Sequence, residues 1–141
     1  MAEMSGIDRQ NSAGAVRARD KSRRVTIQTL KNKAVLAEKC IVAERFLERL
    51  VGLIGRATLN AGEGMFFPRC NNIHMWFMRM PIDVVFIRRA GDRWEVSSVR
   101  ENVRPWKLLP VADFRATETL ELPLGTIQRC GVSAGDEVCI N

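Results

Sequence analysis

The chain has 141 residues, of which 46% are hydrophobic and 27% are charged, and its formal net charge at pH 7 is +6. This length allows one domain with a sizeable core, and the composition excludes a collagen-like or wholly disordered chain. No apolar run reaches the roughly 18–20 residues that a membrane-spanning helix needs. The positive charge favours an acidic partner but does not identify one.

The first 23 residues are polar and basic and contain almost no large apolar side chains. Such a segment cannot bury enough surface to offset its ordering entropy, so we expect a disordered tail over residues 1–23 and a single β-rich domain over residues 24–141. The tail also lacks the apolar stretch of a signal peptide, which predicts a cytoplasmic protein. A nucleic-acid-binding arm is an alternative, although no aromatic residue is interleaved with its arginines.

The domain begins with a β pattern. Val25 and Ile27 alternate with polar residues, and a polar turn follows, so residues 24–42 are expected to form a hairpin. Residues 43–54 then repeat apolar side chains at helical spacing, with charged residues between them, which predicts the main helix. Further along, residues 84–87 are apolar on both faces, which is typical of a buried central strand.

Turn residues divide the second half of the chain. Gly91 and Asp92 indicate a tight hairpin turn after the central strand. Residues 100–113 contain two prolines and are expected to form a long, partly packed loop. Short strands are expected at residues 65–67, 94–99, 117–122 and 137–140, and one helical turn at 126–130. The predicted fold is mainly β, a small antiparallel β-barrel or sandwich of seven or eight short strands with one main helix.

An aspartate opens the central strand. Asp83 is followed by Val84-Val85-Phe86-Ile87, so its carboxylate is expected to be buried. A buried carboxylate without a partner is costly, so Asp83 must accept hydrogen bonds, pair with a cation or be protonated. We expect it to tie the start of the strand to backbone amides or to an arginine. Arg45 and Arg56 are the candidate charge partners.

The segment before this strand contains the only histidine of the chain. If it is extended, His74, Trp76, Met78 and Met80 share one face, and such a face suits either the wall of a ligand pocket or the core. Three polar groups, those of His74, Arg79 and Asp83, lie within this apolar run and favour a ligand-binding site. The predicted binding site consists of His74, Trp76, Met78, Arg79, Asp83, Arg45 and Arg56.

Cys70 and His74 could also act as a metal or nucleophile pair. Along an extended chain these side chains are about 13 Å apart, so they meet only if a turn at Asn71-Asn72 folds the chain back. With one histidine, a metal would need ligands from distant segments, so we predict no metal and no cofactor. A hydrolase or thiol enzyme that uses Cys70, His74 and Asp83 remains the catalytic alternative.

Several short motifs occur in an order that resembles the domain of unknown function 192 family. The motifs are Gly52-Leu-Ile-x-Arg56, Gly64-Met-Phe-Phe67, Pro81-Ile-Asp-Val-Val-Phe86, Leu120-Glu-Leu-Pro-x-Gly125 and Gly135-Asp-x-Val138. The resemblance covers residues 25–140 and implies a compact, barrel-like β fold without an established activity. Where the family usually has Trp-Met-Lys-Asn-Thr, this chain has His-Met-Trp-Phe-Met at residues 74–78. Members of the family are often exported.

The sequence therefore predicts a non-catalytic β-barrel that binds a small molecule or a protein segment at residues 74–83. The alternatives are the Cys70-based enzyme and nucleic-acid binding through the basic tail. A small molecule or a protein is favoured over nucleic acid as the partner.

Overall fold

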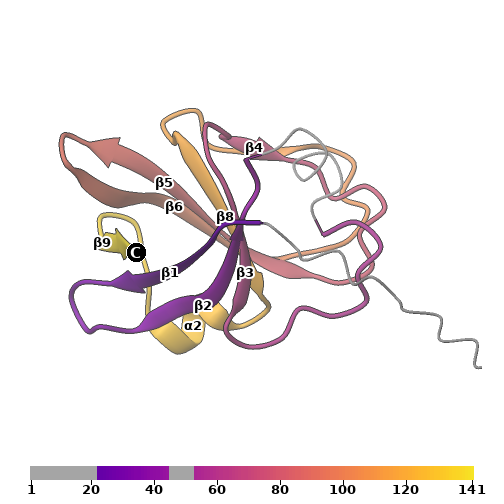
Figure 1. The fold of residues 1–141 in the computed structure, drawn as a ribbon. Helices are drawn as coiled ribbons and strands as arrows, with labels where there is room; N and C mark the ends of the chain where they lie inside the picture. The colour runs from indigo at the N-terminus through magenta and orange to yellow at the C-terminus, as the bar shows by residue number, and fades with distance from the viewer. Residues whose placement is uncertain (1–21, 45–52) are drawn as a thin grey trace, which may run out of the picture.

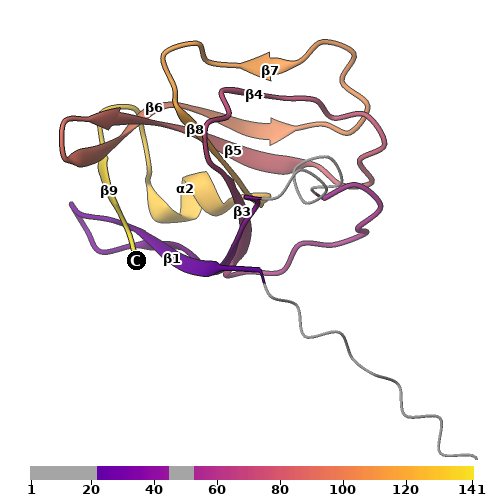
Figure 2. The ribbon, with the colours of Figure 1, turned by 45° about the horizontal axis from the view of Figure 1, so that its top comes forward.

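The computed structural model describes residues 22–44 and 53–141 of the chain. Seven strands close into a barrel in the order β1-β2-β3-β8-β5-β6-β9, and a two-stranded sheet of β4 and β7 lies outside it (Figures 1 and 2). The barrel strands are β1 Arg24–Thr29, β2 Val35–Val42, β3 Glu63–Phe67, β5 Ile82–Ala90, β6 Arg93–Val103, β8 Glu118–Pro123 and β9 Glu137–Ile140. The remaining elements are β4 Asn72–Ile73, β7 Val111–Ala112 and the short helix α2 Thr126–Cys130.

This architecture confirms the predicted mainly β fold and settles it as a barrel. The hairpin over residues 24–42 is present as the antiparallel pair β1 and β2. The described residues contain nine strands rather than seven or eight, and β3 pairs with β2 in parallel, which the antiparallel expectation missed. A parallel pair needs a long connection rather than a hairpin turn, and residues 43–62 provide the length for it.

Two hydrophobic clusters share the barrel wall. Alternate residues of β5 point to opposite sides of the sheet: Val85 and Ile87 belong to the cluster inside the barrel, and Val84 and Phe86 belong to the second cluster. We call these the barrel core and the outer core. Burial on both faces explains why the central strand reads as continuously apolar.

The outer core lies between one face of the barrel and a covering layer. This covering layer is formed by β4, β7 and the segments next to them. In Figure 2 this layer, with β4 and β7 side by side, runs along the top of the molecule. Asp113 fastens it to the barrel, because its carboxylate accepts hydrogen bonds from the hydroxyls of Ser97 and Ser98, each at 2.6 Å. These bonds and the Arg115 amide and guanidinium outweigh its burial and lower the pKa of Asp113 to about 2.

Residues 100–113 are more regular than their prolines suggested. β6 continues to Val103, and β7 forms at residues 111–112, so the irregular loop is shorter than predicted. The additional order comes from tertiary pairing: β5 supports β6 up to Val103, and β4 supports β7. The helical turn at residues 126–130 is confirmed as α2, whose Ile127 and Cys130 fill one part of the barrel core.

Two predicted elements fall largely outside the described residues. The main helix was expected at residues 43–54, of which 45–52 are not described, and the tail was expected at 1–23, of which 1–21 are not described. In the part of the chain that is described, no helix has the length and apolar character needed to cross a bilayer.

Candidate functional site

The segment that contains the only histidine forms a turn rather than a strand. Phe77 has a positive φ of 62°, and the amide of Met78 lies 3.4 Å from the carbonyl oxygen of Met75. The prediction that His74, Trp76, Met78 and Met80 share one face is therefore wrong. Met78 and Met80 are buried in the outer core, whereas His74 and Trp76 are exposed, because the turn breaks the two-residue alternation of an extended chain.

A second turn, in the loop after β6, packs against the first. Trp106 also has a positive φ, 59°, and its amide donates to the carbonyl of Met75 at 2.8 Å. The indole Nε1 of Trp76 donates in return to the carbonyl of Leu108 at 3.2 Å. The rings of Phe77 and Trp106 meet edge to face, with centroids 5.0 Å apart.

These paired turns hold large apolar side chains in solvent. Phe77 is 59% exposed, Trp106 61% and Leu108 79%. Left-handed backbone conformation costs free energy for bulky residues. The contacts between the two turns must therefore stabilise this conformation at Phe77 and Trp106. We call this surface the aromatic platform; it comprises Trp76, Phe77, Trp106, Leu108 and Leu109.

Positive charge flanks the platform in the sequence of both turns. Arg79 follows the first turn, and Arg104 and Lys107 enclose Trp106 in the second; all three are exposed. Exposed apolar patches bordered by polar side chains mark interaction sites on soluble domains. Of the predicted site residues, the structure gathers His74 and Trp76 here, with ring centroids 5.2 Å apart.

Asp83 belongs to β5 and is buried in the barrel wall, with 1% of the residue exposed. Its Oδ1 accepts a hydrogen bond from the amide of Asn102 at 3.0 Å, and its Oδ2 accepts one from the amide of Ile127 at 2.9 Å. The carboxylate therefore joins three segments, since Asn102 belongs to β6 and Ile127 to the first turn of α2. The sequence predicted that either backbone amides or an arginine would bind the carboxylate of Asp83, and the structure shows backbone amides.

The other predicted residues are dispersed. Arg56 pairs with Glu63, at 3.1 Å, and not with Asp83, whereas Arg45 lies outside the described residues. Met78 is part of the outer core, and Arg79 is exposed. The six predicted residues that the structure describes therefore differ in environment: Asp83 is buried in the barrel wall, whereas His74 and Trp76 are exposed.

The cysteines Cys70 and Cys40 lie in different environments. The thiol of Cys70 donates to the carbonyl of Asn72 at 3.0 Å, while His74 lies against Trp76. Cys40 is fully buried in the barrel core, and this burial raises the pKa of its thiol to about 12. Among the residues that the structure describes, no three His, Cys, Asp or Glu side chains come together as a metal site would require.

Sequence reasoning missed one unusual group, the carboxyl of Glu121. It lies on β8 between Met65 of β3 and Val84 of β5, both of which belong to the outer core. Only 6% of Glu121 is exposed, and burial raises the pKa of its carboxyl to about 8. The signal in the sequence was an acidic residue directly between two leucines, Leu120 and Leu122, in a predicted strand.

Known proteins resemble this chain in sequence over most of its length. Residues 26–140 match the model of DUF192, a family described as uncharacterized ACR. The chain belongs to the DUF192 family. A relative named UPF0127 protein, from Thermococcus sibiricus, is 30% identical over 101 residues, which cover 69% of this chain and 62% of the relative.

Solved structures share the fold. A Sinorhizobium meliloti protein described as a "putative transcription regulator" superimposes with a TM-score of 0.70 and 26% identity, covering 83% of this chain and 92% of that protein. A Novosphingobium aromaticivorans protein of unknown function superimposes with a TM-score of 0.68 and 25% identity, covering 84% of each chain. The fold of this chain is thus shared by proteins that are only about one quarter identical to it in sequence.

Proposed function

We propose that this DUF192 protein is a non-catalytic barrel whose aromatic platform binds an apolar segment of another protein. The observation that supports this is the pair of left-handed turns at Phe77 and Trp106, which are held together by backbone hydrogen bonds and keep their rings in solvent. Tryptophan and other rigid aromatic side chains lose little entropy on binding and dominate the energetics of protein interfaces.

The shape of the platform favours a protein over a small molecule. Small molecules are usually enclosed by concave pockets, whereas Phe77, Trp106 and Leu108 are each more than half exposed. Such protruding side chains insert into pockets of a partner or pack along an extended or helical segment. The exposed cations Arg79, Arg104 and Lys107 favour a partner with acidic residues beside its apolar ones.

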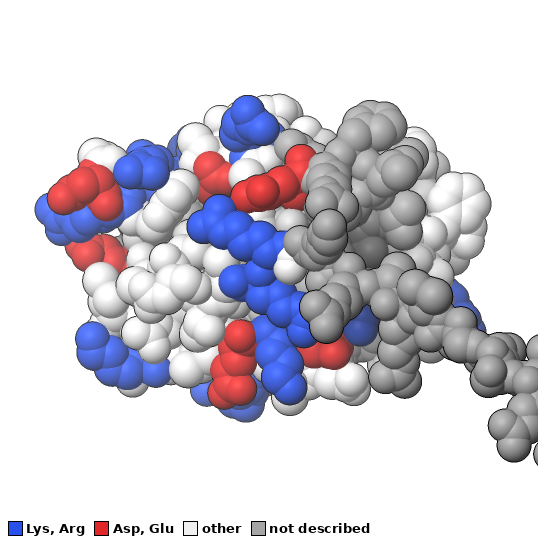
Figure 3. All heavy atoms as spheres, viewed as in Figure 1, with Lys and Arg blue, Asp and Glu red and all other residues white. Residues whose placement is uncertain are grey.

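Charge placement supports a protein partner over nucleic acid. On the face shown in Figure 3, a column of Lys and Arg side chains crosses the middle, but Asp and Glu side chains lie directly beside it, so the basic surface is narrow. Several of the cations are already neutralised by ion pairs. These pairs are Arg23–Glu44, Lys31–Asp136, Arg56–Glu63, Arg88–Glu95 and Arg93–Glu137.

Selection from a displayed peptide library would test the proposal. The immobilised protein should enrich peptides with aromatic or aliphatic residues next to Asp or Glu. Phe77→Ala and Trp106→Ala should each weaken binding of the enriched peptides about tenfold or more, because both remove a central aromatic contact. Fluorescence anisotropy of labelled peptides measures this change.

A matched control uses Leu124, which is 52% exposed but lies beside α2 and outside the platform. Leu124→Ala should leave the affinity of the selected peptides unchanged. Peptides that bind Phe77→Ala and Trp106→Ala as tightly as the original protein would refute the platform as the binding surface. So would a library that yields no enriched peptide.

A further inference from the structure

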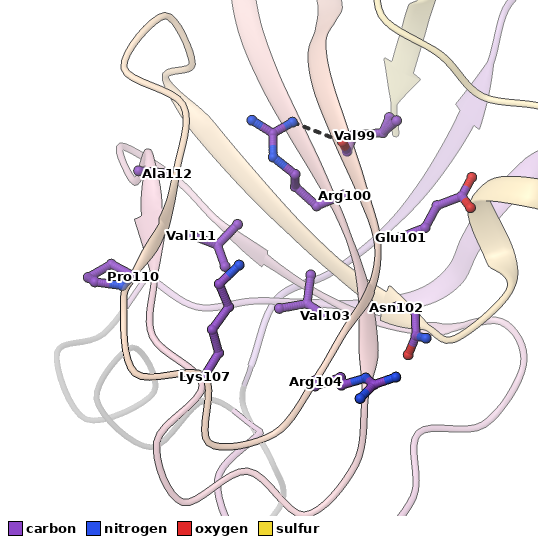
Figure 4. Close-up of a pocket in the computed structure, with 10 residues that line it drawn as sticks. All are labelled: Val99, Arg100, Glu101, Asn102, Val103, Arg104, Lys107, Pro110, Val111 and Ala112. Carbon is purple, nitrogen blue, oxygen red and sulfur yellow. Dashed lines mark hydrogen bonds between the residues drawn. The ribbon is translucent and has the colours of Figure 1, made fainter.

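A pocket of about 760 Å³ lies between the end of β6 and the loop that leads to β7 (Figure 4). This volume is within the range of about 300–1,000 Å³ found for small-molecule sites. The pocket is separate from the aromatic platform but uses the same loop, since Arg104 and Lys107 line it while Trp106 between them belongs to the platform.

Two cationic head groups project over the same side of the pocket. Figure 4 shows the guanidinium of Arg100 and the ammonium of Lys107 on the side of β6 that faces β7. Arg100 is held in place because its Nη1 donates to the carbonyl of Val99 at 2.9 Å and its Cζ lies 5.9 Å from the centre of the Phe86 ring. A guanidinium has five N–H donors, so the others are available to a ligand.

The cations that line this pocket outnumber its carboxylates. Within the described part of the chain, no carboxylate forms an ion pair with Arg100, Arg104 or Lys107, in contrast to the paired cations elsewhere on the surface. One acidic residue, Glu101, lines the pocket, but Figure 4 shows its carboxylate on the other side of β6 from Arg100 and Lys107.

Apolar side chains complete the wall beside these cations. Val103 and Val111, both buried, and Pro110 line the same space. A site that combines convergent polar donors with an apolar surface suits a ligand that has both characters. We infer that the pocket binds a small organic anion, in which a carboxylate or phosphate is attached to a short apolar body.

The buried aspartate positions this pocket. The pairing of β5 with β6 shifts register between Ile82 and Val84, which lie opposite Val103 and Arg100, so β6 bulges between them. Asn102 lies in this bulge with a φ of 49°, and its amide donates to Asp83. A bulge changes the direction in which neighbouring side chains point, so Asp83 fixes the course of the strand from which Arg100 projects.

Titration of the full chain with defined anions, followed by amide NMR shifts, would test the inference. The probes are 3-phenylpropionate and phenyl phosphate, with the uncharged 3-phenylpropanol and inorganic phosphate as controls. The two organic anions should give saturable shifts concentrated in residues 99–112, and they should bind more tightly than either control. Comparison of the carboxylate with the phosphate identifies the preferred anionic group.

Neutralising variants separate specific contacts from general attraction. Arg100→Gln and Lys107→Gln should each weaken binding of the organic anions about threefold to tenfold, since each removes one charge-assisted contact. Lys107 is exposed, so its variant keeps the test valid even if Arg100→Gln disturbs packing on Phe86. Arg129→Gln, which removes an exposed cation on α2, should change the affinity less than about twofold.

Three results would overturn the inference. Equal shifts with 3-phenylpropanol would show that charge does not contribute. Equal weakening by Arg129→Gln would show that only net charge attracts the anion. Shifts that fail to saturate, or that lie outside residues 99–112, would show that the pocket is not the binding site.

Discussion

The central strand and the turn just before it contain similar residue types but differ completely in environment. Phe86 of β5 is fully buried in the outer core, whereas Phe77, nine positions earlier, is 59% exposed. Phe86 pairs with Ser98 of β6 and Thr119 of β8 on its two sides, whereas Phe77 has left-handed backbone in an exposed turn. The comparison separates residues that maintain the barrel from residues that the barrel presents to solvent.

Substitution of Asp83 in the central strand should have a large effect on the stability of the fold. Asp83→Ala should lower the free energy of unfolding by about 2–5 kcal/mol, because it leaves the amides of Asn102 and Ile127 without their acceptor. Urea denaturation followed by circular dichroism measures the loss. Asp83→Asn keeps one acceptor oxygen and should lose less; a change below about 0.5 kcal/mol in Asp83→Ala would show that the carboxylate does not support the fold.

The acidic residue of the outer core should make stability depend on pH. The pKa of Glu121 is about 8 in the folded protein against a usual 4.5, so the folded state keeps a proton that the unfolded state releases. The contribution of Glu121 to the free energy of unfolding is fully present below about pH 4.5. This contribution is lost as the pH rises through about 8. Glu121→Gln, which resembles the protonated acid, should therefore be more stable than the original protein at pH 9 by about 2–4 kcal/mol.

Denaturation of both proteins across this pH range measures the difference, and contributions from the other titrating groups cancel in the comparison. Near pH 4 the two proteins should be almost equally stable. Glu137→Gln provides the control, because it removes an ion pair with Arg93 at the surface and should cost less than about 1 kcal/mol. A constant difference between Glu121→Gln and the original protein at every pH would contradict the assignment.

Substitutions in the exposed turn at Phe77 should have little effect on the stability of the fold. Phe77→Gly should alter the free energy of unfolding by less than about 1 kcal/mol, because relief of the left-handed backbone offsets loss of the ring contact with Trp106. Phe86→Ala, the matched change in the outer core, should cost about 3–5 kcal/mol. Thermal denaturation of both variants measures the contrast, and comparable losses would mean that Phe77 is a structural residue.

Local sequence patterns determined most of the barrel. The alternation around Val25 and Ile27, the Gly91-Asp92 turn and the apolar run after Asp83 identified β1, the β5–β6 hairpin and the central strand. These elements follow from short-range physics: side chains alternate across a strand, and two-residue turns require a backbone that glycine adopts easily. The need for Asp83 to be hydrogen-bonded also followed from the sequence, because a buried carboxylate cannot remain unpartnered.

Only the tertiary structure decided where the segment of residues 74–80 points and which residues share a site. An extended chain would have put His74, Trp76 and Met78 together, but the carbonyl of Met75 accepts the amide of Trp106, more than 30 positions away, and the chain turns. The partners of Asp83 and the burial of Glu121 likewise come from segments distant in sequence. Periodicity reports which side of an element is apolar, whereas the contacts that reverse a chain or desolvate a carboxylate exist only after the elements pack.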